Sequence, residues 1–113
     1  MQVPGAHRAE IDPRKVRDYL LSHDHVVGRV KAPFFEALGF TRSGWHELSS
    51  SLLRFLRTEE ALPSHLDQFG QRYVVLGTLH GPAGRSARVV TVWVVLTGEE
   101  TPRFVTAYPD PRR

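Results

Sequence analysis

Hydrophobic positions recur at helical spacing in the first half of the chain and at strand spacing in the second half. Asp12-Pro13 is typical of a helix start, because aspartate caps the helix and proline fits its first position. An apolar stripe follows at i, i+3 and i+4, and it predicts a short helix that ends near Ser22, before a polar link. The residues of this stripe are Val16, Tyr19 and Leu20.

Two further helices are predicted before the spacing changes. The second covers Gly28–Leu38 and stops at Gly39. Pro33 is tolerated only in a first turn, which favours a start later than Gly28. The third opens near Trp45, which we expect to anchor it on the sheet, and ends around Glu60. Its apolar stripe comprises Trp45, Leu48, Leu52, Leu53 and Leu56.

From Gln71 onward the apolar residues alternate with a period of two, which is typical of strands. Three strands are predicted over Gln71–Leu79, Ser86–Leu96 and Arg103–Tyr108, with Gly-containing turns between them. Residues 62–70 lack periodicity and are predicted to be a loop, and 109–113 to be a frayed tail. We therefore predict an α+β fold, with N-terminal helices packed on one face of a C-terminal three- to four-stranded antiparallel sheet.

Length and composition limit the class of protein. A chain of 113 residues is expected to form a single domain over 1–113, with an ordered core from about 10 to 109. Its longest apolar run, Val92–Leu96, is far too short to span a membrane, and no apolar leader follows Met1. The absence of cysteine excludes disulfides, a thiol nucleophile and a cysteine zinc site. We expect a cytoplasmic protein.

The distribution of charge points to a polyanionic partner. All basic residues except Lys15 and Lys31 are arginine, a bias that phosphate binding and a GC-rich genome explain equally well. Residues 1–68 balance acids and bases, so the whole excess of +3 lies in residues 69–113. A basic C-terminal half suits RNA.

Several segments, in order, carry a resemblance to a known family. The chain resembles the bacterial domain-of-unknown-function family 6883 over about residues 10–109. That family in turn resembles the barnase–EndoU–colicin–RelE superfamily, most of whose members are metal-independent RNases used as toxins. One departure is Val26, because the family usually has proline after the histidine that corresponds to His25. The matching segments are Val27–Phe35 with Leu38–Phe40, Gly70–Tyr73, Gly81–Arg85, Thr91–Trp93 and Pro102–Pro109.

The resemblance implies a set of catalytic residues for RNA cleavage without metal, which needs a base, an acid and cations around the phosphate. Among the six histidines it favours His25 as the general base or acid. Lys31, which stands out as one of two lysines in an arginine-rich chain, and Arg103 are expected to stabilise the phosphate, and Thr91 and Thr106 to orient it. The structural interpretation stays open, with His25 a surface histidine and Lys31 a helix-surface charge.

A metal site and an RNA-binding face are the other candidate sites. His23-Asp24-His25 offers two metal ligands without a recognisable third, so no metal or other cofactor is expected. If the aliphatic row of 86–96 packs under the helices, Thr91 and Trp93 point to the open face of the sheet, where aromatic rings could stack on bases. Otherwise Trp93 belongs to the core and Thr91 is only a strand former. The residues expected to bind RNA are Tyr73, Arg85, Trp93 and Tyr108.

These observations favour a metal-independent endoribonuclease toxin that cleaves cytosolic RNA, with tRNA as a candidate substrate. A small acidic antitoxin or immunity protein is expected to cover the open sheet face around Arg85, Thr91, Arg103 and Thr106. A non-catalytic module that binds RNA or a protein through the same face is the alternative, as is an ancillary domain of a larger toxin. The sequence does not determine the oligomeric state.

Overall fold

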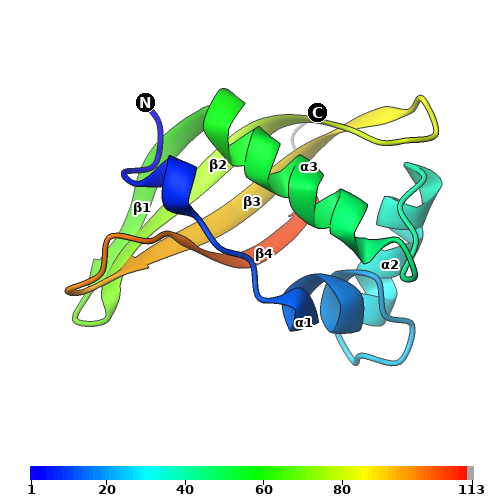
Figure 1. Cartoon of the computed structure of the whole chain (residues 1–113), viewed down its shortest axis with the longest axis horizontal. Coiled ribbons are helices and arrows are strands. Elements are labelled where there is room, and N and C mark those ends of the chain that lie inside the picture. The colour runs from blue at the N-terminus through cyan, green and yellow to red at the C-terminus, as the bar shows by residue number, and fades with distance from the viewer. Residues whose placement is uncertain (112–113) are drawn as a thin grey trace.

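A four-stranded antiparallel sheet carries all the helices on one face in the computed structural model, which describes residues 1–111 (Figure 1). The strands lie in chain order, and the α+β architecture predicted above is confirmed. The helical segments are η1 (Ala6–Arg8), α1 (Pro13–Lys15), the π-helical turn η2 (Val16–Leu20), α2 (Gly28–Ala37) and α3 (Trp45–Thr58). The strands are β1 (Glu60–Asp67), β2 (Gly70–His80), β3 (Ser86–Leu96) and β4 (Arg103–Pro109).

Strand β1 occupies the segment predicted to be a loop, so that prediction is wrong. It pairs with β2 from Glu60 opposite Leu76 to Asp67 opposite Gly70, with an irregularity between Pro63 and Leu66. Only Ala61 of this edge strand is buried, so the segment has no apolar alternation to reveal it. Pro63, which lacks an N–H, is tolerated because the strand lies at the sheet edge.

The faces of the sheet are the reverse of those predicted. Thr91 and Trp93 are both 0% exposed and belong to the row of β3 that the helices cover. The indole Nε1–H of Trp93 donates to Thr91 Oγ1 at 2.8 Å, and that hydroxyl donates to the Val75 carbonyl at 3.2 Å. Both rows of β3 are apolar, and burying the larger side chain, Trp93, removes more surface from water.

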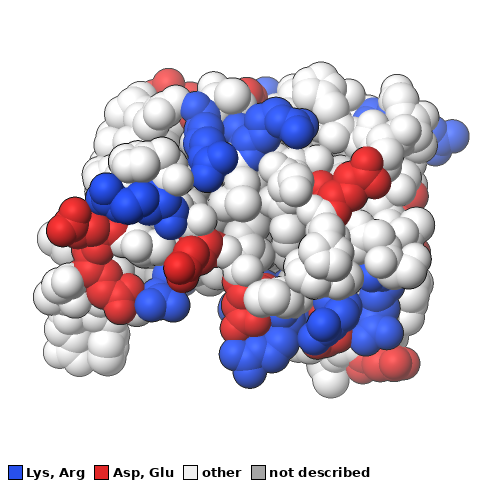
Figure 2. Space-filling model, in the orientation of Figure 1, with Lys and Arg blue, Asp and Glu red and all other residues white. Residues whose placement is uncertain are grey.

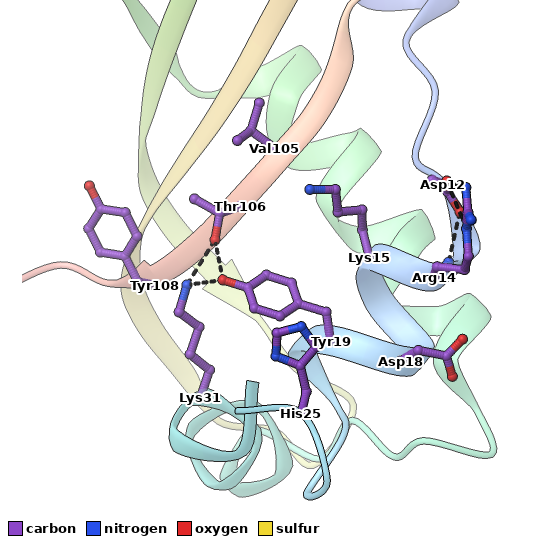
Figure 3. A pocket seen from close by; sticks show the side chains of 10 residues that line it. All are labelled: Asp12, Arg14, Lys15, Asp18, Tyr19, His25, Lys31, Val105, Thr106 and Tyr108. Atoms are coloured by element: carbon purple, nitrogen blue, oxygen red, sulfur yellow. Dashed lines mark hydrogen bonds and ion pairs between the residues drawn. The ribbon is translucent and has the colours of Figure 1, made fainter. Parts of the chain in front are cut away.

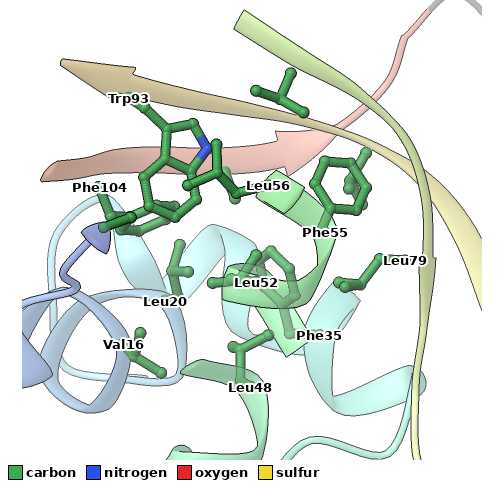
Figure 4. Packing of buried hydrophobic residues seen from close by; sticks show 14 of the residues in the cluster. Val16, Leu20, Phe35, Leu48, Leu52, Phe55, Leu56, Leu79, Trp93 and Phe104 are labelled. Carbon is green, nitrogen blue, oxygen red and sulfur yellow. The ribbon is translucent and has the colours of Figure 1, made fainter. Parts of the chain in front are cut away.

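Helix α3 supplies the side of the core opposite Trp93 (Figure 4). Its buried residues are Leu48, Leu52, Phe55 and Leu56. Trp45, which was expected to anchor α3 on the sheet, is only half-buried and packs against the margin of the core. Its ring stacks on His46 at a centroid distance of 3.6 Å, with the guanidinium of Arg17 5.9 Å from the ring centre.

The ends of the helices and the tail test several local predictions. Asp12 caps α1 as expected, because its carboxylate accepts the Arg14 N–H at 2.9 Å. Helix α2 begins at Gly28 and contains Pro33 beyond its first turn, so the later start that Pro33 favoured is wrong. The predicted frayed tail is ordered at Asp110, which is buried and donates its backbone N–H to the carbonyl of Arg88 at 3.0 Å. Residues 112–113 of the predicted tail lie outside the described part of the chain. No helix among residues 1–111 is long and apolar enough to cross a membrane.

Candidate functional site

An open cleft of about 820 Å³ lies where η2 and α2 meet the edge strand β4 (Figure 3). Helix residues form one wall, and the other wall is a run of β4 side chains. Strand β4 is an edge strand, so these side chains remain accessible from outside the sheet. The lining residues are Asp12, Arg14, Lys15, Asp18, Tyr19, His25, Lys31, Val105, Thr106 and Tyr108.

The centre of the cleft is a lysine bound to two hydroxyl groups. Lys31 Nζ donates to the Tyr19 hydroxyl at 2.6 Å and to Thr106 Oγ1 at 2.8 Å, and the two hydroxyl oxygens are 2.9 Å apart. The ammonium lies 4.9 Å from the centre of the Tyr19 ring and 5.7 Å from that of Tyr108. Within residues 1–111 it has no carboxylate partner, so this half-buried cation lacks a counter-charge.

This cluster changes the acidity of Tyr19. Partial burial by itself raises the pKa of the phenol, but hydrogen bonds from Lys31 and Thr106 and the charge of Lys31 outweigh burial. The pKa of Tyr19 therefore lies below its ordinary value of 10. An oxygen that accepts a hydrogen bond from an ammonium holds a negative charge more easily than a free phenol does.

Two local features of the backbone bring Tyr19 and Lys31 together. Residues 16–20 form a π-helical turn, closed by the Leu21 N–H bonded to the Val16 carbonyl at 3.0 Å. Such turns are frequent at functional sites, because the extra residue redirects the side chains. Gly28 then packs against the carbonyl of Tyr19, and any Cβ at this position would overlap that oxygen. The start of α2 can therefore approach η2 closely only because residue 28 is glycine.

His25 stands at the mouth of the cleft, on the loop before α2. Its ring meets the Tyr19 ring edge-on at a centroid distance of 4.9 Å. Nδ1 accepts the backbone N–H groups of Val27 at 3.0 Å and Gly28 at 3.1 Å. The histidine is therefore tied to the first turn of α2 while it lines the cleft.

The two carboxylates in the cleft wall are already neutralised by arginines. Arg14 lies 2.6 Å from Asp12, and its hydrogen bonds lower the pKa of that carboxyl to about 2. Asp18 is held between Arg17 and Arg42, each at 2.9 Å, which also lowers its pKa. Basic and acidic side chains are likewise interspersed over the face of the molecule that Figure 2 shows. Among residues 1–111, Lys15 and Lys31 have no carboxylate partner, so they leave the cleft electropositive.

The sequence-based site residues divide into two groups. The structure brings His25, Lys31, Thr106 and Tyr108 into the cleft. The others lie elsewhere. Thr91 and Trp93 are buried in the core, and Tyr73 packs beside them on the row of β2 that the helices cover. Arg85 follows the turn between β2 and β3, and Arg103 forms an ion pair with Glu99 at 3.0 Å. Arg85, Thr91, Arg103 and Thr106 therefore do not form the common surface expected for a protein partner.

Sequence reasoning missed Tyr19 and Lys15 as members of the site. Tyr19 was assigned to the apolar stripe of the first helix, and its ring does pack against the core. A phenol at the margin of an apolar stripe is the one signal that pointed to it.

In the described part of the chain, no group of three or more histidine, aspartate or glutamate side chains is placed to hold a metal ion. His23 binds Glu36 at 2.9 Å.

Comparisons with known proteins place this architecture among solved folds. It is similar to a chain of the contact-dependent growth inhibition toxin–immunity protein complex from Klebsiella pneumoniae 342, with a TM-score of 0.72 and 18% sequence identity. The match covers 88% of this chain and 98% of the other. No curated protein matches by sequence. A family model does match residues 2–111, and the chain belongs to that family, described as a domain of unknown function, DUF6883.

Proposed function

We propose that this protein is a metal-independent endoribonuclease toxin, with the cleft between η2, α2 and β4 as its active site. The observation that carries this proposal is the half-buried Lys31 ammonium, which is held by two hydroxyl groups and lacks a carboxylate partner among residues 1–111. A cation withdrawn from water without a counter-charge favours binding of an anion. A phosphodiester of RNA supplies that anion, beside aromatic rings on which bases can stack.

The proposed reaction needs no group from outside the chain. The 2′-hydroxyl of a nucleotide loses its proton to a base in the cleft, and its oxygen forms a bond to the neighbouring phosphorus. The bond from phosphorus to the 5′-oxygen breaks, and the electron pair stays on that oxygen, which takes a proton from the Lys31 ammonium. Lys31 then regains the proton held by the base, and the products are a 2′,3′-cyclic phosphate and a 5′-hydroxyl. Lys15 and Lys31 stabilise the charge on phosphorus-bound oxygens during the transfer.

A toxin of this kind needs a neutralising partner. The solved chain of similar fold comes from a toxin–immunity protein complex, which supports both the toxin assignment and the partner class. We propose a small acidic immunity protein that covers the cleft and places carboxylates against Lys15 and Lys31. This replaces the sheet-face surface expected from the sequence. RNA and the partner then compete for the same cations, and the association rate falls as salt rises.

The decisive experiment compares wild-type protein with the Lys31→Met variant. Purified protein is incubated with total RNA and with a tRNA fraction in EDTA, and the new ends are identified chemically. We expect cleavage that leaves 2′,3′-cyclic phosphates and falls about 100-fold or more in Lys31→Met. Arg54→Met is the matched control, because it removes an exposed charge from α3, outside the cleft, and should cleave as wild type does.

Other results would contradict the proposal. Equal rates for wild type and Lys31→Met would remove the cleft from the mechanism, and activity that requires an added divalent metal would exclude the proposed reaction class. Binding of RNA that depends on Lys31 but leaves the RNA intact would establish the alternative, a non-catalytic RNA-binding module.

A further inference from the structure

His25 has the hydrogen bonds of a helix-capping residue. Its carbonyl accepts the N–H of Arg29 at 2.9 Å, while Nδ1 accepts those of Val27 and Gly28, two and three residues further along the chain. Asparagine, aspartate and serine cap helices in this way, with a side-chain acceptor for N–H groups that the first turn leaves unpaired. Here an imidazole nitrogen takes that role, although histidine is not among the preferred caps.

The cap determines which nitrogen of the ring carries a proton. Backbone amides are always donors, so Nδ1, which faces two of them, must present its lone pair. In a neutral imidazole the proton then resides on Nε2. No partner for Nε2 exists among residues 1–111, and the ring lines the cleft beside Tyr19 (Figure 3). The free nitrogen of His25 is therefore an N–H donor without an available lone pair.

We propose that His25 is a fixed hydrogen-bond donor for a substrate oxygen, and that the ionised Tyr19 oxygen, rather than the imidazole, accepts the 2′-hydroxyl proton and becomes a neutral phenol. This inference rests on the proposed function and differs from the role expected for His25 from the sequence. Ionised Tyr19 has the acceptor lone pair that His25 lacks, and the Lys31 ammonium, which donates to this oxygen at 2.6 Å, stabilises its negative charge. The same hydrogen bond is the path by which the proton returns to Lys31 after the 5′-oxygen has taken one from the ammonium.

The tautomer is measured directly, without any need for activity. Nitrogen-15 NMR of the histidine rings, assigned with the His25→Asn variant, distinguishes a bare ring nitrogen from a protonated one. We expect Nδ1 of neutral His25 to be bare and Nε2 to be protonated. A neutral ring with the proton on Nδ1 would overturn the proposal even if the protein cleaves RNA. If no RNA cleavage is found, the proposed function fails, but the capping tautomer is still tested by this spectrum.

Three variants test the division of roles in cleavage. His25→Asn keeps a capping acceptor and an N–H donor but cannot accept a proton, so we expect melting at the wild-type temperature and an unchanged shape of the kcat pH profile. His25→Asp keeps the cap but puts a carboxylate against the phosphate, and should lose cleavage without losing stability. Tyr19→Phe keeps the ring and should lower kcat about 100-fold or more.

His23→Asn is the matched control, because it changes a neighbouring histidine that does not line the cleft. Loss of the acidic limb of the pH profile in His25→Asn, but not in His23→Asn, would identify His25 as the base and overturn the proposal. Wild-type cleavage by Tyr19→Phe would overturn it as well.

Discussion

Replacing Thr91 by valine separates the two roles that this residue has been given, as a phosphate ligand or as part of the core. Thr91 is 0% exposed, and its hydroxyl accepts the Trp93 indole N–H at 2.8 Å and donates to the Val75 carbonyl at 3.2 Å. Valine has nearly the same shape, so the change removes both hydrogen bonds and leaves little or no cavity. Its main consequence is an indole N–H buried without an acceptor.

The expected size follows from these two bonds. A buried donor left without a partner costs about 1–3 kcal/mol, and part of this is offset because the Thr91 hydroxyl itself is no longer buried. We therefore expect Thr91→Val to lower the free energy of unfolding by about 2 kcal/mol. Combining it with Trp93→Phe, which removes the donor, should reveal a coupling of about 1 kcal/mol between the two positions.

Denaturant unfolding followed by fluorescence or circular dichroism measures both free energies. Thr78→Val is the matched control, since Thr78 lies on β2 in the row facing away from the helices, and its change should stay within about 0.5 kcal/mol. RNA cleavage by Thr91→Val should equal that of wild type below the melting temperature. A stability loss under about 0.5 kcal/mol together with abolished cleavage would refute the core assignment and restore Thr91 to the site.

Three further predictions test the site and the packing. Tyr19 should ionise below pH 10, so the free energy of unfolding should rise with pH between the pKa of Tyr19 in the folded state and pH 10. Ultraviolet titration should show that Lys31→Met loses this lowering of the Tyr19 pKa. The same titration curve in Lys31→Met and wild type would contradict the Lys31–Tyr19 hydrogen bond. Gly28→Ala should cost about 1–3 kcal/mol in unfolding experiments, because its Cβ overlaps the Tyr19 carbonyl, and wild-type stability would show that α2 does not pack there. Leu52→Ala should lower the free energy of unfolding by about 2–5 kcal/mol and Trp45→Ala by about 2 kcal/mol or less, since Leu52 is fully buried and Trp45 is not. A larger loss of stability in Trp45→Ala would place Trp45 in the core.

Local signals in the sequence were enough to predict three helices followed by three strands, in the right order, but not the edge strand β1. The Asp12 cap and the strand Ser86–Leu96 match the structure, because capping and side-chain period depend on neighbours along the chain. Proline geometry was misleading for α2, which begins at Gly28 although Pro33 favoured a later start. The family resemblance, rather than any pattern of the residues, singled out His25, and the rarity of lysine in an arginine-rich chain drew attention to Lys31.

Only the tertiary structure decided which side of the sheet is buried and which residues meet in the cleft. Alternation in β3 separates two rows of side chains, but both rows are apolar, so the pattern does not say which row the helices cover. In the structure the helices cover the row with the large Trp93 side chain, whose indole N–H is satisfied in the core by the Thr91 hydroxyl. Tyr19 and Lys31 reach Thr106 across 87 and 75 residues of sequence, and no local rule relates positions so far apart. Their meeting depends on a π-helical turn and on a glycine that allows two backbones to touch, which are properties of packing in three dimensions.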